Sequence, residues 1–537
     1  MAKDSKTADV LVVGAGPSGA AFTWSLSEAG VDVLCLEQGD WPDAGAYPPM
    51  FDDHEVRRQG DFNPDPNVRG LSQDYPINNA ESSINPLMHN AVGGSSIHWG
   101  AHFPRLHPSD FKVKTLDGVG ADWPVSYVDL EPFFDLNDKM MGVAGLVGDT
   151  AYPPKSPRQM PPIPLGVLGE TMAAAFDRLG WHWWPSDSAI NTIDYDGRKA
   201  CNFAGPCELG CARGAKATAD VTYWPRALAN GARLATGARV REITIGHDGL
   251  ASGVVYLDAD GAVREQKARA VVMACNAIGT PRLLLNSRSL MFPDGLANGS
   301  GLLGRNLMMH PVAIVTGVFD KEVDGYKGPL ACSLFSHQFY ETDLTRGFVR
   351  GYGLQVVRTF GPVSAALGGI GVHARAPWGA RHRAAFSEVF NHVISVAIIA
   401  DDLPETANRV ELDPELTDGD GIPAPRVVYK TSGNSRKMLD HGIARATELM
   451  EAAGARRVMA NRQIKATGWH LLGTARMGAD PGSSVVDAEG RCHDVPNLYV
   501  VDGSIFATGS AVNPTSTIQA LALHIADAFK RGAGNRK

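Results

Sequence analysis

The feature that most constrains the fold is a glycine-rich turn near the N-terminus. Residues 8–13 form a predicted apolar strand, and residues 20–29 form a predicted helix. Between them, Gly14, Gly16 and Gly19 make a G-x-G-x-x-G pattern. Glycines at this spacing let the backbone turn tightly and approach a pyrophosphate, whose charge is met by the N-terminus of the helix. The turn therefore predicts a Rossmann-type dinucleotide-binding domain.

The segment after the helix completes the motif. Residues 31–36 form a second predicted strand, which closes a β-α-β unit, and Glu37 follows eighteen positions after Gly19. An acidic residue at this place accepts a hydrogen bond from a ribose hydroxyl. A glycine pattern alone also occurs in ordinary turns, but the two strands, the helix and the acid together indicate dinucleotide binding. The unit by itself leaves FAD and NAD both open.

Charge and hydropathy exclude several classes of function. A formal net charge of −8 gives no basic surface for nucleic acid. The chain contains no strongly cationic helix and no apolar run long enough for insertion into a membrane. Residues 1–7 lack the charged and then apolar pattern of an export signal. We therefore expect a cytoplasmic enzyme with a small-molecule substrate.

The remaining pattern predicts two domains. Residues 38–90 are rich in Pro, Asp, Asn and Gly and predict a long loop that covers a domain. Residues 312–465 differ in composition and predict an inserted second domain. Further predicted strands are 234–245, 253–257, 268–273, 370–372, 393–400 and 498–502, and further predicted helices are 280–286, 435–452 and 516–529. The last strand and the last helix are expected to rejoin the first domain.

Four further stretches resemble one enzyme family. They are residues 91–100, residues 304–311, residues 468–470 with 473–478, and residues 501–504 with 513–517. Together they resemble the glucose-methanol-choline (GMC) oxidoreductases. The resemblance implies oxidation of an alcohol carbon with FAD as cofactor. It also implies an α/β fold, α+β overall, with a Rossmann-type FAD-binding domain built from discontinuous segments (1–311 and 466–537) and a β-sheet substrate-binding domain (312–465).

The resemblance also implies the cofactor-binding residues. Those at the ADP half of FAD are Gly14, Gly16, Gly19 and Glu37. Those along the pyrophosphate and the flavin are Gly93, Gly94 and Ser95. Those at the edge of the isoalloxazine are Asp502, Gly503, Asn513, Pro514 and Thr515.

Removing hydride from an alcohol requires a base for the hydroxyl proton, and imidazole titrates in the useful range. His470 matches the catalytic histidine of the family, and Asn513 fills the second catalytic position, where family members have His or Asn. An amide there can hold the substrate oxygen without competing for the proton. His98, His102 and His310 also lie in the family motifs, and we interpret them as structural or cofactor-packing groups.

Three cysteines gather in a loop at 201–218. Cys201, Cys207 and Cys211 have the spacing C-x5-C-x3-C, which resembles the catalytic subunit of bacterial FAD-dependent glucose, fructose, gluconate and glucoside dehydrogenases. That resemblance implies a 3Fe-4S cluster, a small partner subunit, a cytochrome acceptor and a periplasmic location if the partner carries the export signal. The run after Cys211 also resembles family members without a cluster. Reduced structural thiols and zinc ligands therefore remain as alternatives.

The substrate is the least constrained part. We expect an alcohol carbon of a sugar, glycoside or polyol, with a primary or aromatic alcohol and no cluster as the alternative. A second class of function is an electron-relay flavoprotein subunit without substrate turnover of its own. A third alternative, an NAD-linked dehydrogenase, predicts that the purified protein has no flavin absorbance.

Overall fold

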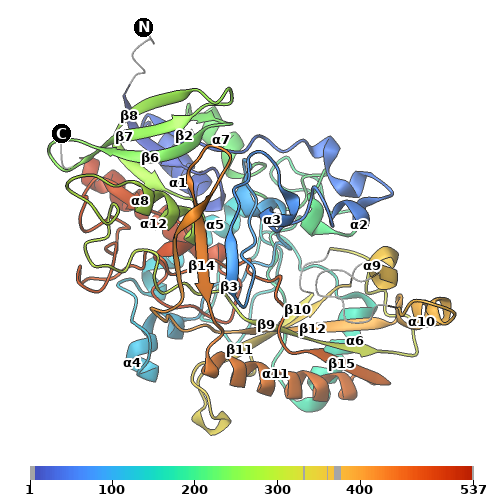
Figure 1. Cartoon of the computed structure of the whole chain (residues 1–537). Coiled ribbons are helices and arrows are strands. Elements are labelled where there is room, and N and C mark those ends of the chain that lie inside the picture. Colours follow the sequence, from blue (N-terminus) through green and yellow to red (C-terminus); the bar gives the residue numbers. More distant parts are fainter. Residues whose placement is uncertain (1–6, 330–332, 360, 368–375, 535–537) are drawn as a thin grey trace.

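The computed structural model describes residues 7–329, 333–359, 361–367 and 376–534 (Figure 1). The strand predicted at 370–372 lies outside the described residues. Three sheets organise the chain, and both termini lie at the end of the molecule that the first sheet occupies (Figure 1). None of the described helices is long and apolar enough to span a bilayer.

The first sheet is the predicted Rossmann-type sheet. Its seven strands are β1 (Ala8–Val13), β2 (Val33–Leu36), β5 (Arg233–Ala235), β6 (Arg239–Ile245), β7 (Ala251–Leu257), β8 (Val263–Met273) and β16 (Leu498–Val500). The long strand β8 pairs antiparallel with β7 along its first half and parallel with β1 and β16 along its second half. The mixed α/β fold, with a dinucleotide-binding sheet that the C-terminal segment rejoins, is confirmed.

Four helices stack beside this sheet: α1 (Pro17–Glu28), α5 (Tyr127–Met141), α7 (Tyr223–Ala229) and α12 (Thr515–Gly534). The α1 helix begins at Pro17, three residues before the predicted start, because proline is well suited to the first helical position. Its residues Ser18–Ser27 are all buried between the sheet and its neighbours. This burial fixes the N-terminus of α1 against the turn that precedes it.

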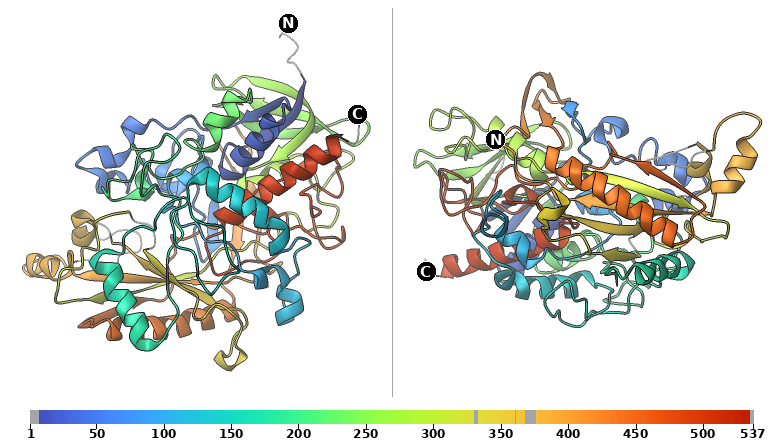
Figure 2. Two further views of the ribbon diagram at one scale, coloured as in Figure 1. Left: turned by 180° about the vertical axis from the view of Figure 1, so that it is seen from behind. Right: turned by 90° about the horizontal axis from the view of Figure 1, so that it is seen from below.

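The second sheet has the strand order β15-β9-β12-β11-β10-β4, and every pairing in it is antiparallel. Its strands are β4 (Trp184–Pro185), β9 (Val312–Val318), β10 (Leu334–Ser336), β11 (Tyr352–Val357), β12 (Val393–Ala400) and β15 (Arg457–Asn461). One face packs on α6 (Gly166–Leu179) and α11 (Gly433–Ala452), and both helices can be followed beside the sheet in Figure 2. The other face is directed toward the first sheet.

The third sheet joins segments that are far apart in the sequence. It consists of β3 (Asn78–Ser82), β14 (Pro423–Tyr429) and β13 (Arg409–Thr417), and the helix α8 (Asn276–Asn286) packs on it. The polar strand β3 lies within the predicted covering loop, where its sequence shows no alternation of apolar residues. The predicted domain boundaries at 312 and 465 stay a prediction. Two strands from before residue 312, β3 and β4, pair with strands of the predicted second domain in the third and second sheets.

Short helices complete the described chain. The α-helices are α2 (His54–Arg57), α3 (Pro66–Arg69), α4 (Val113–Asp117), α9 (Pro362–Leu367) and α10 (His382–Val389). The 3-10 helices are η1 (Ala44–Ala46), η2 (Pro48–Met50), η3 (Gly94–Ile97), η4 (Pro108–Lys112), η5 (Cys207–Leu209), η6 (Leu344–Arg346) and η7 (Gly503–Ile505).

Candidate active site

A cavity of about 420 Å³ extends between the first and second sheets. One end is bordered by the glycine-rich turn and Glu37, and the other by His470 and the second sheet. The predicted cofactor residues that line it are Gly14, Gly16, Glu37, Gly94, Ser95, Asp502, Gly503, Asn513, Pro514 and Thr515. The structure thus brings together along one cavity most of the residues predicted from four separate motifs.

Gly19 and Gly93 are not among the lining residues and act behind the cavity wall. A Cβ on Gly19 would lie 2.1 Å from the carbonyl oxygen of Gly14, so only glycine lets α1 pack against the turn. Gly93 has φ +94° and donates its N–H to the carbonyl of Ala15 at 3.0 Å. Both residues therefore shape the backbone that borders the cavity.

The glycine-rich turn leaves room for an anion. Gly14 has φ +104°, and a Cβ there would lie 2.5 Å from the carbonyl oxygen of Ala274. Gly16 is the N-cap of α1 and brings no side chain to the helix end, so the first N–H groups of the helix are open toward the cavity. A helix N-terminus with exposed N–H groups is a favourable site for a phosphate group.

The two glycine-rich segments touch each other. Gly94 has φ +54°, and a Cβ on it would lie 2.8 Å from the Cα of Gly16. Nearby lining side chains have buried polar atoms without a partner among the described residues: His89 Nδ1, His98 Nε2 and Trp99 Nε1. Such atoms are costly unless a bound group pairs with them. These features fit a dinucleotide in the cavity.

Glu37 is fixed by the backbone at the first end of the cavity. Its carboxylate accepts hydrogen bonds from the N–H of Ala15 at 2.8 Å and from the N–H of Gly39 at 2.9 Å. Burial raises the pKa of Glu37, although both N–H groups act in the opposite direction. The carboxylate is therefore held in one orientation at the place predicted for a ribose contact.

Asp502 also lines the cavity, but its carboxylate is used within the protein. It accepts hydrogen bonds from the N–H of Ser504 at 2.9 Å and from the hydroxyl of Thr280 at 2.6 Å. Asn513 and Pro514 line the cavity immediately before the N-terminus of α12. Asp502 thus positions the 503–505 turn, and a second helix N-terminus is directed at the cavity.

The reactive end carries a chain of four hydrogen-bonded side chains. The Nε2 of Gln355 donates to the Oδ1 of Asn513 at 2.6 Å, so the Nδ2 of Asn513 faces His470 as a donor. It lies 3.3 Å from His470 Nε2. On the other side of the ring, His470 Nδ1 lies 2.8 Å from the Nδ1 of His310. Since Nε2 of His470 accepts, its proton is on Nδ1 and is donated to His310.

This arrangement keeps His470 neutral. Burial lowers the pKa of His470 to about 4, and it lowers the pKa of His310 far below the ordinary range. His470 Nε2 therefore carries a lone pair at neutral pH, on the side of the ring that Asn513 shares. A neutral imidazole with a fixed tautomer at a cavity wall is able to accept a proton.

His98 and His102 also line the cavity, whereas His310 stands behind His470. His98 Nδ1 bonds to the carbonyl oxygen of Glu208 at 3.0 Å, and His102 Nδ1 pairs with the hydroxyl of Ser186. The contact of His310 with His470 was missed by the sequence reasoning, and so was Gln355. No sequence signal points to Gln355, because its place depends on the register of β11 in the second sheet.

The loop with the three cysteines packs beside the cavity. The Nζ of Lys216 donates to the carbonyls of Ile97 at 2.7 Å and Trp99 at 3.2 Å, which ties this loop to the 93–100 segment. Among the residues that the structure describes, no group of three or more His, Cys, Asp or Glu side chains is arranged to hold a metal ion. Burial raises the pKa of Cys201, which favours its thiol form. The iron-sulfur cluster predicted for the three cysteines therefore gains no support from the described residues and stays a prediction.

Comparisons with known proteins find relatives along almost the whole chain. Models of the GMC oxidoreductase family match residues 169–312 and 404–522, and the NAD(P)-binding Rossmann-like domain matches residues 12–56. The 2-methyl-1,2-propanediol dehydrogenase of Mycolicibacterium austroafricanum is 43% identical over 99% of this chain and 96% of its own length. The fructose dehydrogenase large subunit of Gluconobacter japonicus is 28% identical over 98% of this chain and 99% of its own length. The crystal structure of pyridoxine 4-oxidase from Mesorbium loti has a TM-score of 0.66 at 19% identity, covers 98% of this chain and 99% of its own, and shares the fold.

Proposed function

The chain belongs to the GMC oxidoreductase family, and from this we propose that it oxidises an alcohol carbon with His470 as the base and Asn513 as the partner of that base. The family and the Rossmann-like fold imply FAD as the cofactor. The observation that carries the proposal is the hydrogen bond between His470 and Asn513 at the end of a cavity whose other end is the glycine-rich turn.

FAD supplies an acceptor for hydride when it is bound, and the chain supplies the proton chemistry. His470 Nε2 takes the proton of the substrate hydroxyl, and the positive charge that forms on the ring is shared through Nδ1–H with His310. The amide of Asn513 has a second N–H, which can donate to the substrate oxygen. Gln355 fixes the orientation of this amide by donating to its oxygen.

The side of His470 that faces away from the cavity is closed to water, which supports this assignment. His310 is 1% exposed and lies directly behind the base. A water molecule next to the base would be a competing proton donor. Excluding water also strengthens the electrostatic interactions at the reacting atoms. The Nδ1 side of His470 is thus shielded by His310, and Nε2 is the atom left to accept the substrate proton.

We infer that the electrons leave to a separate acceptor. One relative is named as the large subunit of a dehydrogenase, which supports a small subunit as a partner of this chain, with a cytochrome as the further acceptor predicted from the sequence. No electron step is assigned to Cys201, Cys207 and Cys211, because the described residues give them no metal-holding arrangement. An iron and acid-labile sulfide assay on anaerobically purified protein tests this: flavin without iron agrees, whereas about three irons per flavin would restore the cluster.

The experiment for the function is anaerobic reduction of the bound flavin by alcohols, followed by visible absorbance. We expect bleaching by an alcohol in the wild type and a loss of the reduction rate by about 10²–10⁴-fold in His470→Ala. His247→Ala is the matched control, because this exposed histidine lies on the hairpin between β6 and β7. A flavoprotein that no alcohol bleaches would be an electron-relay subunit, and a protein without flavin absorbance would favour the NAD-linked alternative.

The comparisons restrict the substrate only to an alcohol. The relatives' names include both a diol dehydrogenase and a fructose dehydrogenase subunit. The sugar, glycoside or polyol expected from the sequence is therefore one candidate beside a primary alcohol.

A further inference from the structure

The face of the second sheet that borders the cavity is almost entirely aliphatic. Strands alternate their side chains between two faces, so Gln355 and Val357 of β11 share the face of Ala397 and Ile399 of β12. Val312 of β9 pairs with Ile399 and extends the same face. All five residues line the cavity, and Gln355 is the polar member of the set.

The aliphatic members of this face form a packed cluster of their own. Val312, Ala397 and Ile399 are 8% exposed or less, and Ile314 and Val357 pack against them. The next polar pair on the same face, Thr316 and Ser395, bond to each other through their hydroxyls at 2.9 Å and do not line the cavity. A ligand on this wall therefore meets branched hydrocarbon and one amide.

Gln355 has a free acceptor at a fixed place. The residue is 5% exposed, and its Nε2 is committed to Asn513. Its Oε1 has no hydrogen-bond partner among the described residues, although the side chain borders the cavity. A nearly buried acceptor of this kind favours a ligand that brings a hydroxyl donor.

We propose, on the basis of the function proposed above, that the substrate is an aliphatic alcohol with a second hydroxyl on a neighbouring carbon, and that Gln355 determines this specificity. The hydrocarbon part contacts Val312, Ala397 and Ile399. The reacting hydroxyl is held by His470 and Asn513. The second hydroxyl donates to Oε1 of Gln355, which stands next to Asn513 in the same chain of hydrogen bonds.

The same wall disfavours a sugar. A sugar carries hydroxyls around its whole ring, and each one that meets Val312, Ala397 or Ile399 loses its hydrogen bonds to water without replacement. Gln355 Oε1 is the free acceptor on this face, and it can bind one hydroxyl of the substrate in addition to the reacting one. A monoalcohol fits the wall but leaves Gln355 Oε1 unpaired. The expected order of substrates is therefore diol, monoalcohol, sugar.

The test uses the flavin-loaded, full-length enzyme and anaerobic flavin reduction by three probes: 2-methyl-1,2-propanediol, 2-methyl-1-propanol and fructose. We expect the diol to exceed the monoalcohol in kcat/KM by about tenfold, the effect of one hydrogen bond. Gln355→Leu should remove this preference. Gln355→Glu keeps an acceptor and loses the donor to Asn513, so it should keep the diol preference while kcat falls for both alcohols.

Two results would overturn the inference while the proposed function stands. One is a higher kcat/KM for fructose than for the diol, and the other is an equal loss for both alcohols in Gln355→Leu, which would make Gln355 only a support for Asn513. Failure of the proposed function is distinguishable, because then no alcohol would bleach the flavin or His470→Ala would bleach at the wild-type rate.

Discussion

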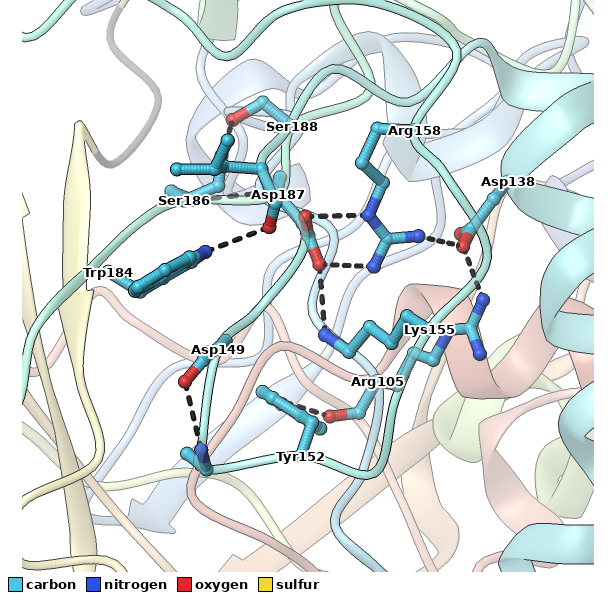
Figure 3. Close-up of polar contacts among 12 residues, drawn as sticks. Arg105, Asp138, Asp149, Tyr152, Lys155, Arg158, Trp184, Ser186, Asp187 and Ser188 are labelled. Carbon is cyan, nitrogen blue, oxygen red and sulfur yellow. Dashed lines mark hydrogen bonds and ion pairs between the residues drawn. The ribbon is translucent and has the colours of Figure 1, made fainter.

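Buried polar side chains form two neighbouring clusters in this protein, one around Asp187 and one around His470, and they differ in charge. Around Asp187, cations and carboxylates alternate: Arg158 donates to Asp187 at 2.8 and 3.0 Å and also pairs with Asp138, and Lys155 donates to Asp187 at 3.1 Å (Figure 3). Around His470 the side chains are neutral imidazoles and amides. The first cluster neutralises its charges internally, whereas the second is able to take up a charge.

The two clusters are adjacent. Ser186, which precedes Asp187, pairs through its hydroxyl with His102 on the cavity wall. Burial by itself would raise the pKa of Asp187. The positive charges of Lys155 and Arg158 outweigh this effect and hold the pKa below its ordinary value. No such cation or carboxylate perturbs His470, whose pKa is lowered by burial alone. The charges around Asp187 are therefore fixed and serve as structural support, whereas the charge of His470 can change during the reaction.

The largest expected effect is on stability, in the charged cluster. Asp187→Ala leaves Lys155 and Arg158 buried without their shared carboxylate, and we expect a loss of about 3–5 kcal/mol in the free energy of unfolding. Urea denaturation of the FAD-loaded protein measures it. The control is Asp194→Ala, which removes an ion pair with Lys199 whose side chains are 59% and 66% exposed, and no measurable change is expected. Equal stability of the two variants would show that the Asp187 cluster is not a structural support.

The next effect concerns the neutral cluster. His310→Leu removes the acceptor for His470 Nδ1–H, so the imidazole is no longer held in one tautomer, and we expect kcat to fall by about tenfold. His310→Asn retains an acceptor and should recover most of the rate. The flavin content, read from the visible absorbance, should stay at the wild-type level in both variants. A loss of flavin in His310→Leu would instead indicate a role in cofactor packing, as the sequence motif suggested.

The sequence predicted the half of the site that is built from backbone. The strand at 8–13 has the predicted bounds, and Gly14 and Gly16 line the cavity as the motif predicts, because residues that are neighbours in the sequence form this turn. The roles of His470 and Asn513 stay predictions, although the structure brings the two side chains together. The family resemblance supplied these two residues, and composition alone would not have found them.

The other half of the site depends on contacts between distant segments. Gln355 faces the cavity only because β11 pairs with β12 in one register, and a shift by one residue would turn it into the core. The strand β3 was predicted as loop because its residues Asn78–Ser82 are polar, and it forms by pairing with β14 about 350 residues later. Sequence patterns report such pairings poorly, since the partner strand decides them.

The smallest expected effect is the response of the neutral cluster to pH. His470 must be neutral to accept a proton, and because its pKa is lowered to about 4, protonation removes the base only as the pH falls through about 4. We therefore expect kcat/KM for flavin reduction to stay constant within about twofold between pH 6 and pH 8. A histidine with the ordinary pKa near 6.5 would lose about three quarters of its neutral form at pH 6. A decline of kcat/KM centred near pH 6.5 would mean that a carboxylate or the bound cofactor raises the pKa of His470. The cluster around His470 would then also contain a charged partner, as the cluster around Asp187 does.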